Sequence, residues 1–571
     1  MRKISLRGRD TMNKPRLVII GAGGAGLAAA LEAAKYDIDI LLITKSYYRN
    51  QTYKWSSHGG CTWKTHGFNA AVKANDSIEA HIRDTIKGGA YANNPYLVET
   101  LCKGAVELID WLSGLGINFD RNGNEIAARP FGGCGTPRSV FIEDRLGFHI
   151  QKTLNLHIDD LIQSGRLIII ENMRALEILK NNNGQVEGLK SINIHTLEYI
   201  NISCSGVIIA DGGGASMYAP TAVSLDKTCD GIVMAIKAGV DVIDMEFVQF
   251  HPTGIASNVL VFDGSLVEEV LRFDGAKLIN KHGKRFMFDY HALGETATRD
   301  EVARGIYREI INGNGYDNQS VMLDIVSCKD AIINWYPALF ERLTQAGYDV
   351  KNSFHIYVRP TAHFLMGGVK INTNSETSLP GLYVAGESAA GVHGANRLGG
   401  NGLSEALVFG RIAGENAAQY CLSTSTVPTI ITNLGSFRIN SKDYVYAPDC
   451  LLNKLRRDMY WHAGPTRNLA NLEKMQSMIN EININISKID LGSGSRASMQ
   501  VQNYFDLKNL VLASDMIVKA AILRKESRGS HYLESYINRN DKFKGIKFSY
   551  QNNLTIASNY TYKNYKKELV S

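Results

Sequence analysis

Residues 16–30 read RLVIIGAGGAGLAAA, and this stretch decides the fold of the 571-residue chain. An apolar run leads into a glycine turn and then into an alanine-rich segment, a pattern typical of a buried strand followed by a helix. In such a unit Gly21 permits the tight turn, Gly23 and its neighbour Gly24 lie where a pyrophosphate approaches the backbone, and Gly26 lets helix and strand pack closely. The pattern therefore predicts a phosphate-binding β-α-β unit whose helix N-terminus faces the negative charge.

Three further segments support this prediction, because a GxGxxG motif alone is a weak signal. Residues 38–45 (IDILLITK) form a second predicted strand at the expected distance. It ends in Thr44-Lys45-Ser46, where many such folds place an acid that binds a ribose, and hydroxyl and backbone groups can replace that acid. Residues 206–214 (GVIIADGGG) and 380–388 (PGLYVAGES) repeat the strand-then-glycine design. We therefore predict a discontinuous nucleotide-binding domain of Rossmann-like type.

An inserted region and a helical region complete the predicted organisation. Residues 246–360 mix short strands, turns and a helix over 299–311, and are placed to act as a lid. Apolar residues at three-and-four spacing predict helices over 451–461, 472–489 and 506–525. The predicted fold class is α/β, with an inserted α+β capping domain and a C-terminal helical domain. The predicted divisions are 1–14 (N-terminal tail), 15–245 (nucleotide-binding domain, first segment), 246–360 (capping domain), 361–431 (nucleotide-binding domain, second segment), 432–548 (helical domain) and 549–571 (C-terminal extension).

Composition indicates an ordinary soluble globular protein, with 44% apolar and 21% charged residues. No apolar run reaches the length of a membrane span. The net charge of +6 is modest, and the one basic run is at 563–567, so nucleic acid is not indicated. The eight cysteines show no spacing suited to zinc or an iron-sulfur cluster, and no metal site is predicted. The polar opening segment lacks the apolar stretch of a signal peptide, which favours the cytoplasm.

Five segments together resemble the flavoprotein subunits of succinate dehydrogenases and fumarate reductases, a family that includes L-aspartate oxidase. They are Gly21–Gly26, 244–255 (DMEFVQFHPTGI), 360–369 (PTAHFLMGGV), 392–401 (VHGANRLGGN) and 526–532 (ESRGSHY). The resemblance implies FAD as the cofactor and a small dicarboxylate as the substrate. It places FAD contacts at Gly21, Gly23, Gly24, Gly26, Thr44, Lys45, Ser46, Gly59, Gly60, Asp230, Glu387, Arg397, Gly402 and Leu403.

The resemblance also implies that His251, His363 and Arg397 hold the substrate carboxylates, with Phe131 near the apolar middle of the substrate. Removing a dianion from water requires charge-assisted donors, each worth roughly 1.5–3 kcal/mol. Taken singly, each histidine is as readily explained as a hydrogen-bonded core residue. Three such groups at positions that match the family favour the binding role.

Arg299 is the proton donor that the resemblance implies, supplied through Glu269 and Arg272. The pKa of arginine exceeds about 12 in water, which makes it a poor acid. It can serve only where the reacting carbon is very basic and a nearby carboxylate returns the proton, the role proposed for Glu269. By residue type alone, an Arg-Glu-Arg salt-bridge chain without chemistry remains the alternative.

Two positions depart from the family pattern. Members with covalent FAD attach it to a histidine ahead of a Gly-Gly pair; counted from Gly59-Gly60, this chain has Thr52 or Tyr53 there, and His58 is out of register. We therefore predict non-covalent FAD. In this family the covalent bond raises the flavin potential, so its absence favours fumarate reduction.

The second departure is Glu268, which stands where a threonine normally touches a substrate carboxylate. Two like charges about 4 Å apart repel by about 4 kcal/mol at an effective dielectric near 20, close to a thousandfold in affinity. Glu268 must therefore pair with an arginine, be protonated, or meet a positive group on the substrate. The last option points to aspartate. Aspartate oxidases, however, place a glutamate at the position of Phe131 and lack the Leu-Gly-Gly that follows Arg397 here.

The predicted function is that of an FAD-dependent oxidoreductase that interconverts fumarate and succinate, with hydride transfer at flavin N5 and proton transfer by Arg299. The alternatives are oxidation of an amino-dicarboxylate such as L-aspartate or of a more specialised acid, a flavin subunit that only transfers electrons, and a nicotinamide dehydrogenase. The last is disfavoured because one dinucleotide site is visible. An iron-sulfur subunit is a candidate partner. The expected location is cytoplasmic, or peripheral to the inner face of a membrane through partners.

Overall fold

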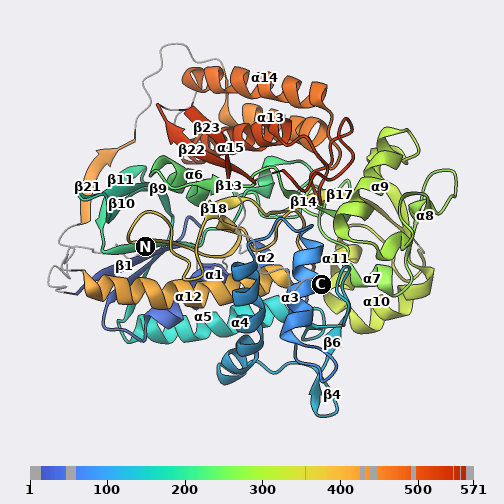
Figure 1. Cartoon of the computed structure of the whole chain (residues 1–571), viewed down its shortest axis with the longest axis horizontal. Coiled ribbons are helices and arrows are strands. Elements are labelled where there is room, and N and C mark those ends of the chain that lie inside the picture. Colours follow the sequence, from blue (N-terminus) through green and yellow to red (C-terminus); the bar gives the residue numbers. More distant parts are fainter. Residues whose placement is uncertain are drawn as a thin grey trace.

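The computed structural model describes residues 14–46, 60–353, 355–424, 431–437, 446–489, 491, 497–543, 545–552 and 554–560. Its centre is a parallel five-stranded sheet in the order β19-β12-β1-β2-β8 (Figure 1). Every residue of β1 and β12 is buried, as expected for a parallel sheet with covered faces. The strands are β1 Arg16–Ile20, β2 Asp39–Ile43, β8 Leu167–Ile170, β12 Gly206–Ile209 and β19 Leu382–Val384.

The predicted strand-turn-helix unit is confirmed, with α1 at Gly24–Ala33 following β1. Gly21 has a φ of 105°, and its N–H donates to the carbonyl of Ile43 on β2 at 2.9 Å. A Cβ at Gly26 would lie 1.9 Å from the carbonyl oxygen of Gly21. The two glycines therefore set how closely α1 can follow the sheet.

Helices and short strands connect β2 to β8. Among them α5 packs against β8 and α1, and α1 also packs against the later helix α12, Asn401–Ser423. The connecting elements include a three-stranded sheet in the order β3-β7-β6. Their bounds are α2 Gly60–Trp63, β3 Phe68–Asn69, α3 Ile78–Gly88, α4 Pro95–Gly114, β4 Arg121–Asn122, β5 Glu125–Ile126, β6 Ala128–Arg129, β7 Ser139–Val140 and α5 Leu146–Gln163.

A second, antiparallel sheet lies beside the first in the order β21-β11-β10-β9. Its last member, β21, spans Ile431–Ser436 and pairs with β11. The domain boundary predicted between 431 and 432 is therefore misplaced, because it cuts this strand from its sheet. The other strands are β9 Met173–Lys180, β10 Val186–Asn193 and β11 Glu198–Ser203.

The inserted region forms an antiparallel sheet in the order β14-β17-β16-β15 with helices around it, at the right of Figure 1. Its apolar cluster is separate from the main core, as expected for a unit with its own core. The elements are β14 Val248–Ile255, α7 Val270–Phe273, β15 Lys277–Ile279, α8 Met287–Tyr290, α9 Arg299–Ile311, β16 Val321–Asp324, α10 Lys329–Trp335, α11 Pro337–Gln345 and β17 His355–Leu365.

The C-terminal region contains three helices, as predicted, and a hairpin that was not predicted. The helices are α13 Pro448–Ala463, α14 Leu469–Asn485 and α15 Ala497–Leu523, at the top of Figure 1. The hairpin strands β22 Gly545–Gln551 and β23 Leu554–Tyr560 extend a sheet in the order β20-β18-β13-β22-β23. The predicted extension at 549 thus begins inside β22. The other elements are α6 Asp230–Lys237, β13 Val242–Ile243, β18 Gly368–Lys370 and β20 Ala389–Ala390.

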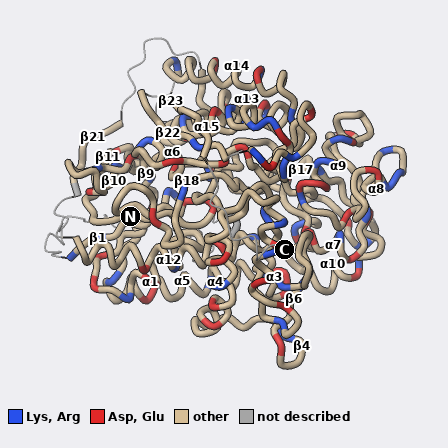
Figure 2. The backbone as a smooth tube through the Cα atoms, viewed as in Figure 1, with Lys and Arg blue, Asp and Glu red and all other residues tan. Residues whose placement is uncertain are grey.

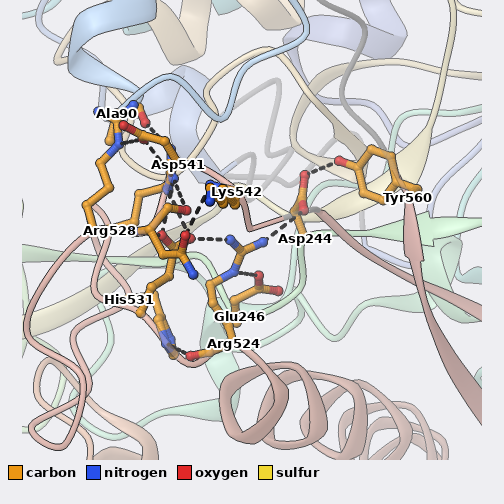
Figure 3. Close-up of polar contacts among 12 residues, drawn as sticks. Ala90, Asp244, Glu246, Arg524, Arg528, His531, Asp541, Lys542 and Tyr560 are labelled. Atoms are coloured by element: carbon orange, nitrogen blue, oxygen red, sulfur yellow. Dashed lines mark hydrogen bonds and ion pairs between the residues drawn. The ribbon is translucent and has the colours of Figure 1, made fainter.

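A buried charge network joins the C-terminal region to the segment that leads into β14 (Figure 3). Arg524 forms ion pairs with Glu246 and, at 2.7 Å, with Glu526. The hydroxyl of Tyr560 on β23 donates to Asp244 at 2.5 Å. Because the charged groups are buried, the pairs compensate one another's desolvation and fix the start of β14.

Acidic and basic residues are interspersed along the chain (Figure 2). None of the helices in the described residues combines the length and the apolar character that crossing a membrane requires.

Candidate active site

A first cavity lies at the carboxyl ends of β1, β2, β12 and β19, where open α/β sheets bind their ligands. A Cβ at Gly23 would meet no atom within 4 Å, so the backbone there faces open space, as a pyrophosphate requires. Gly26 lies behind this surface and acts through packing. Of the predicted FAD contacts, the cavity is lined by Gly21, Gly23, Gly24, Thr44, Lys45, Ser46, Asp230, Glu387 and Gly402.

Asp230, at the start of α6, pairs with two cations at the edge of this cavity. Lys45 Nζ lies 2.8 Å and Arg174 Nη2 lies 2.5 Å from its carboxylate. Burial alone would raise the pKa of Asp230, but Arg174 and Lys45 outweigh burial and lower it to about 2. The carboxylate is therefore ionised, and the cluster ties β2 and β9 to α6.

Glu387 also lines this cavity. Its carboxylate accepts a hydrogen bond from Lys227 Nζ at 2.7 Å and from the backbone N–H of Leu365 at 3.1 Å. A Cβ at Gly213 would lie 2.5 Å from Glu387 Oε1, so that glycine makes room for the carboxylate. Leu365 ends β17, so Glu387 also connects this cavity to the strand that carries His363.

Asp211 lines the same cavity, and sequence reasoning did not assign it a role. Its carboxylate accepts from Gly231 N at 2.6 Å and from Ser388 Oγ at 2.9 Å. Burial and the neighbouring charge of Asp230 nevertheless raise the pKa of Asp211 to about 6. The sequence signal for Asp211 was its position, as an acidic residue just after the strand β12.

Gly60, one of the two glycines predicted beside the flavin, is not among the described residues that line this cavity. Gly60 begins α2, and Gly59, like Thr52, Tyr53 and His58, lies outside the described residues. Thr62 lines the first cavity and accepts a hydrogen bond from Gly24 N at 3.0 Å. From this segment, residues 64–67 line a second cavity. The only sequence feature that marks residues 64–67 is the glycine at Gly67, directly before β3.

The second cavity contains all five predicted substrate-binding residues and adjoins the first at Gly402, which lines both. Arg272 lies behind its wall, and Leu403 lines this cavity and not the first. Its Lys and Arg residues exceed its Glu residues by two, four against two, which gives an electropositive interior. The lining includes Lys64, His66, Arg129, Phe131, His251, Glu268, Glu269, Arg299, His363, Arg397 and Leu403.

Arg299, Glu269 and Arg272 form the continuous chain that the sequence predicted. Arg299 Nε donates to Glu269 Oε2 at 2.6 Å, and Arg272 Nη2 lies 3.4 Å from Glu269 Oε1. Gly132 N also donates to that oxygen at 3.1 Å. Burial alone would raise the pKa of Glu269, but Arg299 and Arg272 outweigh it and leave the pKa below its usual value. One ionised carboxylate thus serves two guanidinium groups.

His251 on β14 and His363 on β17 face each other with ring centroids 5.6 Å apart. Burial, with the positive charges of Arg299 and Arg397 nearby, holds the pKa of both histidines well below the usual value. Both rings are therefore neutral before a substrate enters. Thr253 N donates to His251 Nδ1 at 3.3 Å, which leaves Nε2 as the nitrogen that carries hydrogen. His251 can therefore act as a hydrogen-bond donor toward a ligand, and the arginines supply the positive charge of the cavity.

Gln249 on β14 connects Arg299 with Arg397. Its amide nitrogen donates to the carbonyl of Arg397 at 2.7 Å, and Arg299 Nη1 donates to its amide oxygen at 3.3 Å. The Arg397 guanidinium lies 4.4 Å from the centroid of the Phe364 ring. A Cβ at Gly402 would lie 2.9 Å from Arg397 Nη1, so the glycine leaves space for this side chain.

Glu268 turns to basic partners, the first of the three options open from sequence. It pairs with Arg342 of α11 and lies 2.8 Å from His66 Nε2. Burial alone would raise the pKa of Glu268, but Arg342 and His66 outweigh it and lower the pKa to about 2. The carboxylate is ionised, and its charge is balanced within the protein.

A dinucleotide cavity that adjoins an electropositive cavity defines a cofactor-dependent oxidoreductase. The FAD binding domain family matches residues 16–403, and the fumarate reductase flavoprotein C-terminal family matches residues 452–570. The chain belongs to the fumarate reductase and succinate dehydrogenase flavoprotein family. FAD is its cofactor, and it is an oxidoreductase that acts on the CH–CH bond of a dicarboxylate.

Individual relatives cover nearly the whole chain. An uncharacterised FAD-dependent oxidoreductase of Methanocaldococcus jannaschii is 36% identical and covers 93% of this chain and 95% of its own length. A protein of Methanothermobacter marburgensis, one subunit of its fumarate reductase (CoM/CoB), is 34% identical, with coverages of 91% and 94%. L-aspartate oxidase of a Nostoc species is 31% identical, with coverages of 92% and 91%. The flavoprotein of Escherichia coli quinol fumarate reductase has a TM-score of 0.86 at 28% identity and covers 97% of each chain.

Proposed function

We propose that this chain reduces fumarate to succinate with electrons from its FAD. The observation that carries the proposal is the buried Arg299-Glu269-Arg272 chain in the wall of a cavity that also holds His251, His363 and Arg397. The excess of two positive charges in the lining matches a dianion. Neutral histidines with a free donor nitrogen can bind carboxylate oxygens without adding further charge.

When bound, FAD supplies the hydride at flavin N5. Arg299 is placed to give a proton to the neighbouring carbon, because its guanidinium lines the cavity and contacts Glu269. Glu269 can relay to Arg299 a proton that it receives from Arg272 at its other carboxylate oxygen, and Arg272 takes up a proton in turn. Arg397 and His363 bind and polarise a substrate carboxylate, which stabilises the negative charge that develops there. Phe131 and Leu403 add apolar surface that excludes water.

A second candidate substrate is an amino-dicarboxylate such as L-aspartate. Glu268 Oε2 is buried and accepts no hydrogen bond from another described residue, which would suit an ammonium group. We rank it second because Arg342 and His66 already balance the charge of Glu268, and because Phe131 offers the middle of the substrate no acceptor.

The electrons are proposed to arrive through a partner protein, and an iron-sulfur subunit is the candidate. The support is that two relatives are named as a component of fumarate reductase (CoM/CoB) and as the flavoprotein subunit of an 8-methylmenaquinol:fumarate reductase. Such a partner would also provide the peripheral membrane attachment predicted as one of two locations. We also propose that FAD is bound without a covalent bond.

The test is Arg299→Ala, assayed by fumarate-dependent reoxidation of the chemically reduced flavin. Loss of a positioned acid lowers the rate by about 100- to 10,000-fold, while the amount of bound FAD stays the same. Arg308→Ala is the matched control, because Arg308 lies on the same helix and packs on Tyr532. Unchanged turnover in Arg299→Ala would refute the assignment, and a faster half-reaction with L-aspartate than with succinate would favour the second candidate.

A further inference from the structure

We propose that His66 is an additional substrate-binding residue and that Glu268 is the positioning residue that orients it. The inference rests on the proposed function, since it concerns a dicarboxylate in the same cavity. Both residues line that cavity, and His66 Nε2 lies 2.8 Å from Glu268 Oε1. His66 comes from the nucleotide-binding region of the chain and Glu268 from the capping region.

The contact with Glu268 fixes which nitrogen of His66 carries hydrogen. Glu268 is ionised, with its pKa lowered to about 2 despite burial because Arg342 and His66 outweigh the burial. An ionised carboxylate can only accept hydrogen bonds, so His66 Nε2 must be the donor. The remaining nitrogen, Nδ1, is buried and has no hydrogen-bond partner among the described residues. It is the atom left for a ligand.

A substrate carboxylate at Nδ1 would satisfy this nitrogen. With a hydrogen on each ring nitrogen, the ring would donate to two carboxylates, one from Glu268 and one from the substrate. Glu268 cannot take this role, because its charge would repel the substrate by about 4 kcal/mol at about 4 Å and an effective dielectric near 20. A glutamate in this wall is therefore compatible with a dianion when His66 lies beside it.

The backbone around His66 is held on both sides, as a binding residue requires. The carbonyl of Thr65 accepts from Gly147 N at 2.8 Å, at the start of α5. A Cβ at Gly67 would lie 2.4 Å from Ser139 Oγ and 2.7 Å from the carbonyl oxygen of Val140, so this residue is packed against β7. His66 thus projects from a rigid segment.

The charged residues around His66 give this part of the cavity a net positive charge, which favours the binding of an anion. Arg342 lies behind Glu268 and neutralises it, while the cations of the lining remain in excess. The charged groups that line this space are Lys64, Arg129, Glu268, Glu269, Arg299 and Arg397, with Arg342 behind Glu268.

Two substitutions at His66 separate a binding role from a structural one. The amide nitrogen of glutamine replaces Nε2, so His66→Gln keeps the contact with Glu268 and loses Nδ1. The amide of asparagine replaces Nδ1, so His66→Asn keeps a donor toward the substrate and loses the contact with Glu268. A purely structural histidine would tolerate the first change and suffer from the second. A substrate-binding histidine behaves in the opposite order.

The measurement is a titration of the FAD-loaded chain with malonate, a dicarboxylate that lacks adjacent CH groups, followed by the flavin absorbance difference. His66→Gln raises the Kd of malonate about 10- to 100-fold, the value of one charge-assisted hydrogen bond, and His66→Asn raises it less. The Kd of propionate, a monocarboxylate, changes less than about twofold in both variants when Arg397 still binds its single carboxylate. His282→Gln, at an exposed position of the capping region, is the control.

Glu268→Gln tests the positioning role. It weakens malonate binding in the wild-type background and has no further effect in His66→Gln, because Glu268 acts through His66. Wild-type affinity in His66→Gln, or a larger loss in His66→Asn than in His66→Gln, would overturn the inference and leave the proposed function intact. Failure of the wild-type chain to bind malonate would overturn both.

Discussion

The two cavities that meet at Gly402 are built in different ways. The floor of the FAD cavity is built from backbone, at the glycine turn Gly21–Gly26 and the sheet edge, and charge pairs of Asp230 and Glu387 stand at its sides. The substrate cavity is shaped by charged side chains from several separate segments, including 64–67, 129–131, 266–270 and 397–403. The floor of the first cavity depends on the absence of side chains at a few positions. The second depends on pairs of charges that form only when distant segments fold together.

The largest expected loss of FAD comes from adding a methyl group to the backbone-built cavity. In Gly26→Ala the new Cβ would lie 1.9 Å from the carbonyl oxygen of Gly21, and neither backbone segment can move cheaply. Overpacking costs about 1–3 kcal/mol or more, so the purified chain loses most of its FAD. Gly23→Ala is the matched variant, because its Cβ meets no protein atom and weakens FAD binding only by contact with the cofactor. FAD per chain, read from absorbance, checks the order, and full occupancy in Gly26→Ala would contradict it.

The largest expected loss of folding stability comes from Glu269→Gln in the charge-built cavity. The change leaves Arg299 and Arg272 buried without a carboxylate, which costs about 3–5 kcal/mol. Because the pKa of Glu269 is lowered by its partners, its stabilisation is present above the usual carboxyl range, near pH 4, and is lost as pH falls below it. Thermal unfolding should therefore separate variant and wild type at pH 7 and bring them together in acid.

The control for this variant is Glu301→Gln. Glu301 is partly exposed and pairs with Arg304 at 2.5 Å, so its loss should cost less than about 1 kcal/mol. Equal melting temperatures for Glu269→Gln and Glu301→Gln would contradict this prediction. They would show that the buried charge pair contributes no more to stability than the partly exposed one.

The same difference explains what could be predicted from sequence. Gly21, Gly23 and Gly26 are contiguous with their strand and helix, so the local pattern carried the fold and the FAD cavity. Arg299 and Glu269 were reached through the family resemblance, not through spacing. The pair between Glu268 and Arg342 joins positions 74 residues apart, and nothing in either local segment indicates the other.

Errors in the predicted elements have the same origin. β21 and β22 were assigned to a helical domain and the start of a terminal extension, because an edge strand with mixed polarity has no strong period of its own. Their sheet partners lie more than two hundred residues earlier in the chain, in β11 and β13. Pairing with those partners, not local propensity, makes them strands.

The smallest expected effect is on the affinity for FAD, and it comes from the ionisation of Asp211 in the backbone-built cavity. Asp211 has a pKa raised to about 6, so it is neutral below that pH and ionised above it. Ionisation in the cavity that holds the anionic cofactor costs on the order of 1–2 kcal/mol at an effective dielectric near 20. The affinity for FAD should therefore fall about five- to twentyfold as pH rises from 5 to 8, and Asp211→Asn should remove this dependence. Fluorescence titration of the FAD-stripped chain measures both. A pH-independent affinity in the wild type would mean that Gly231 N and Ser388, which both donate to Asp211, keep the carboxylate ionised at all these pH values.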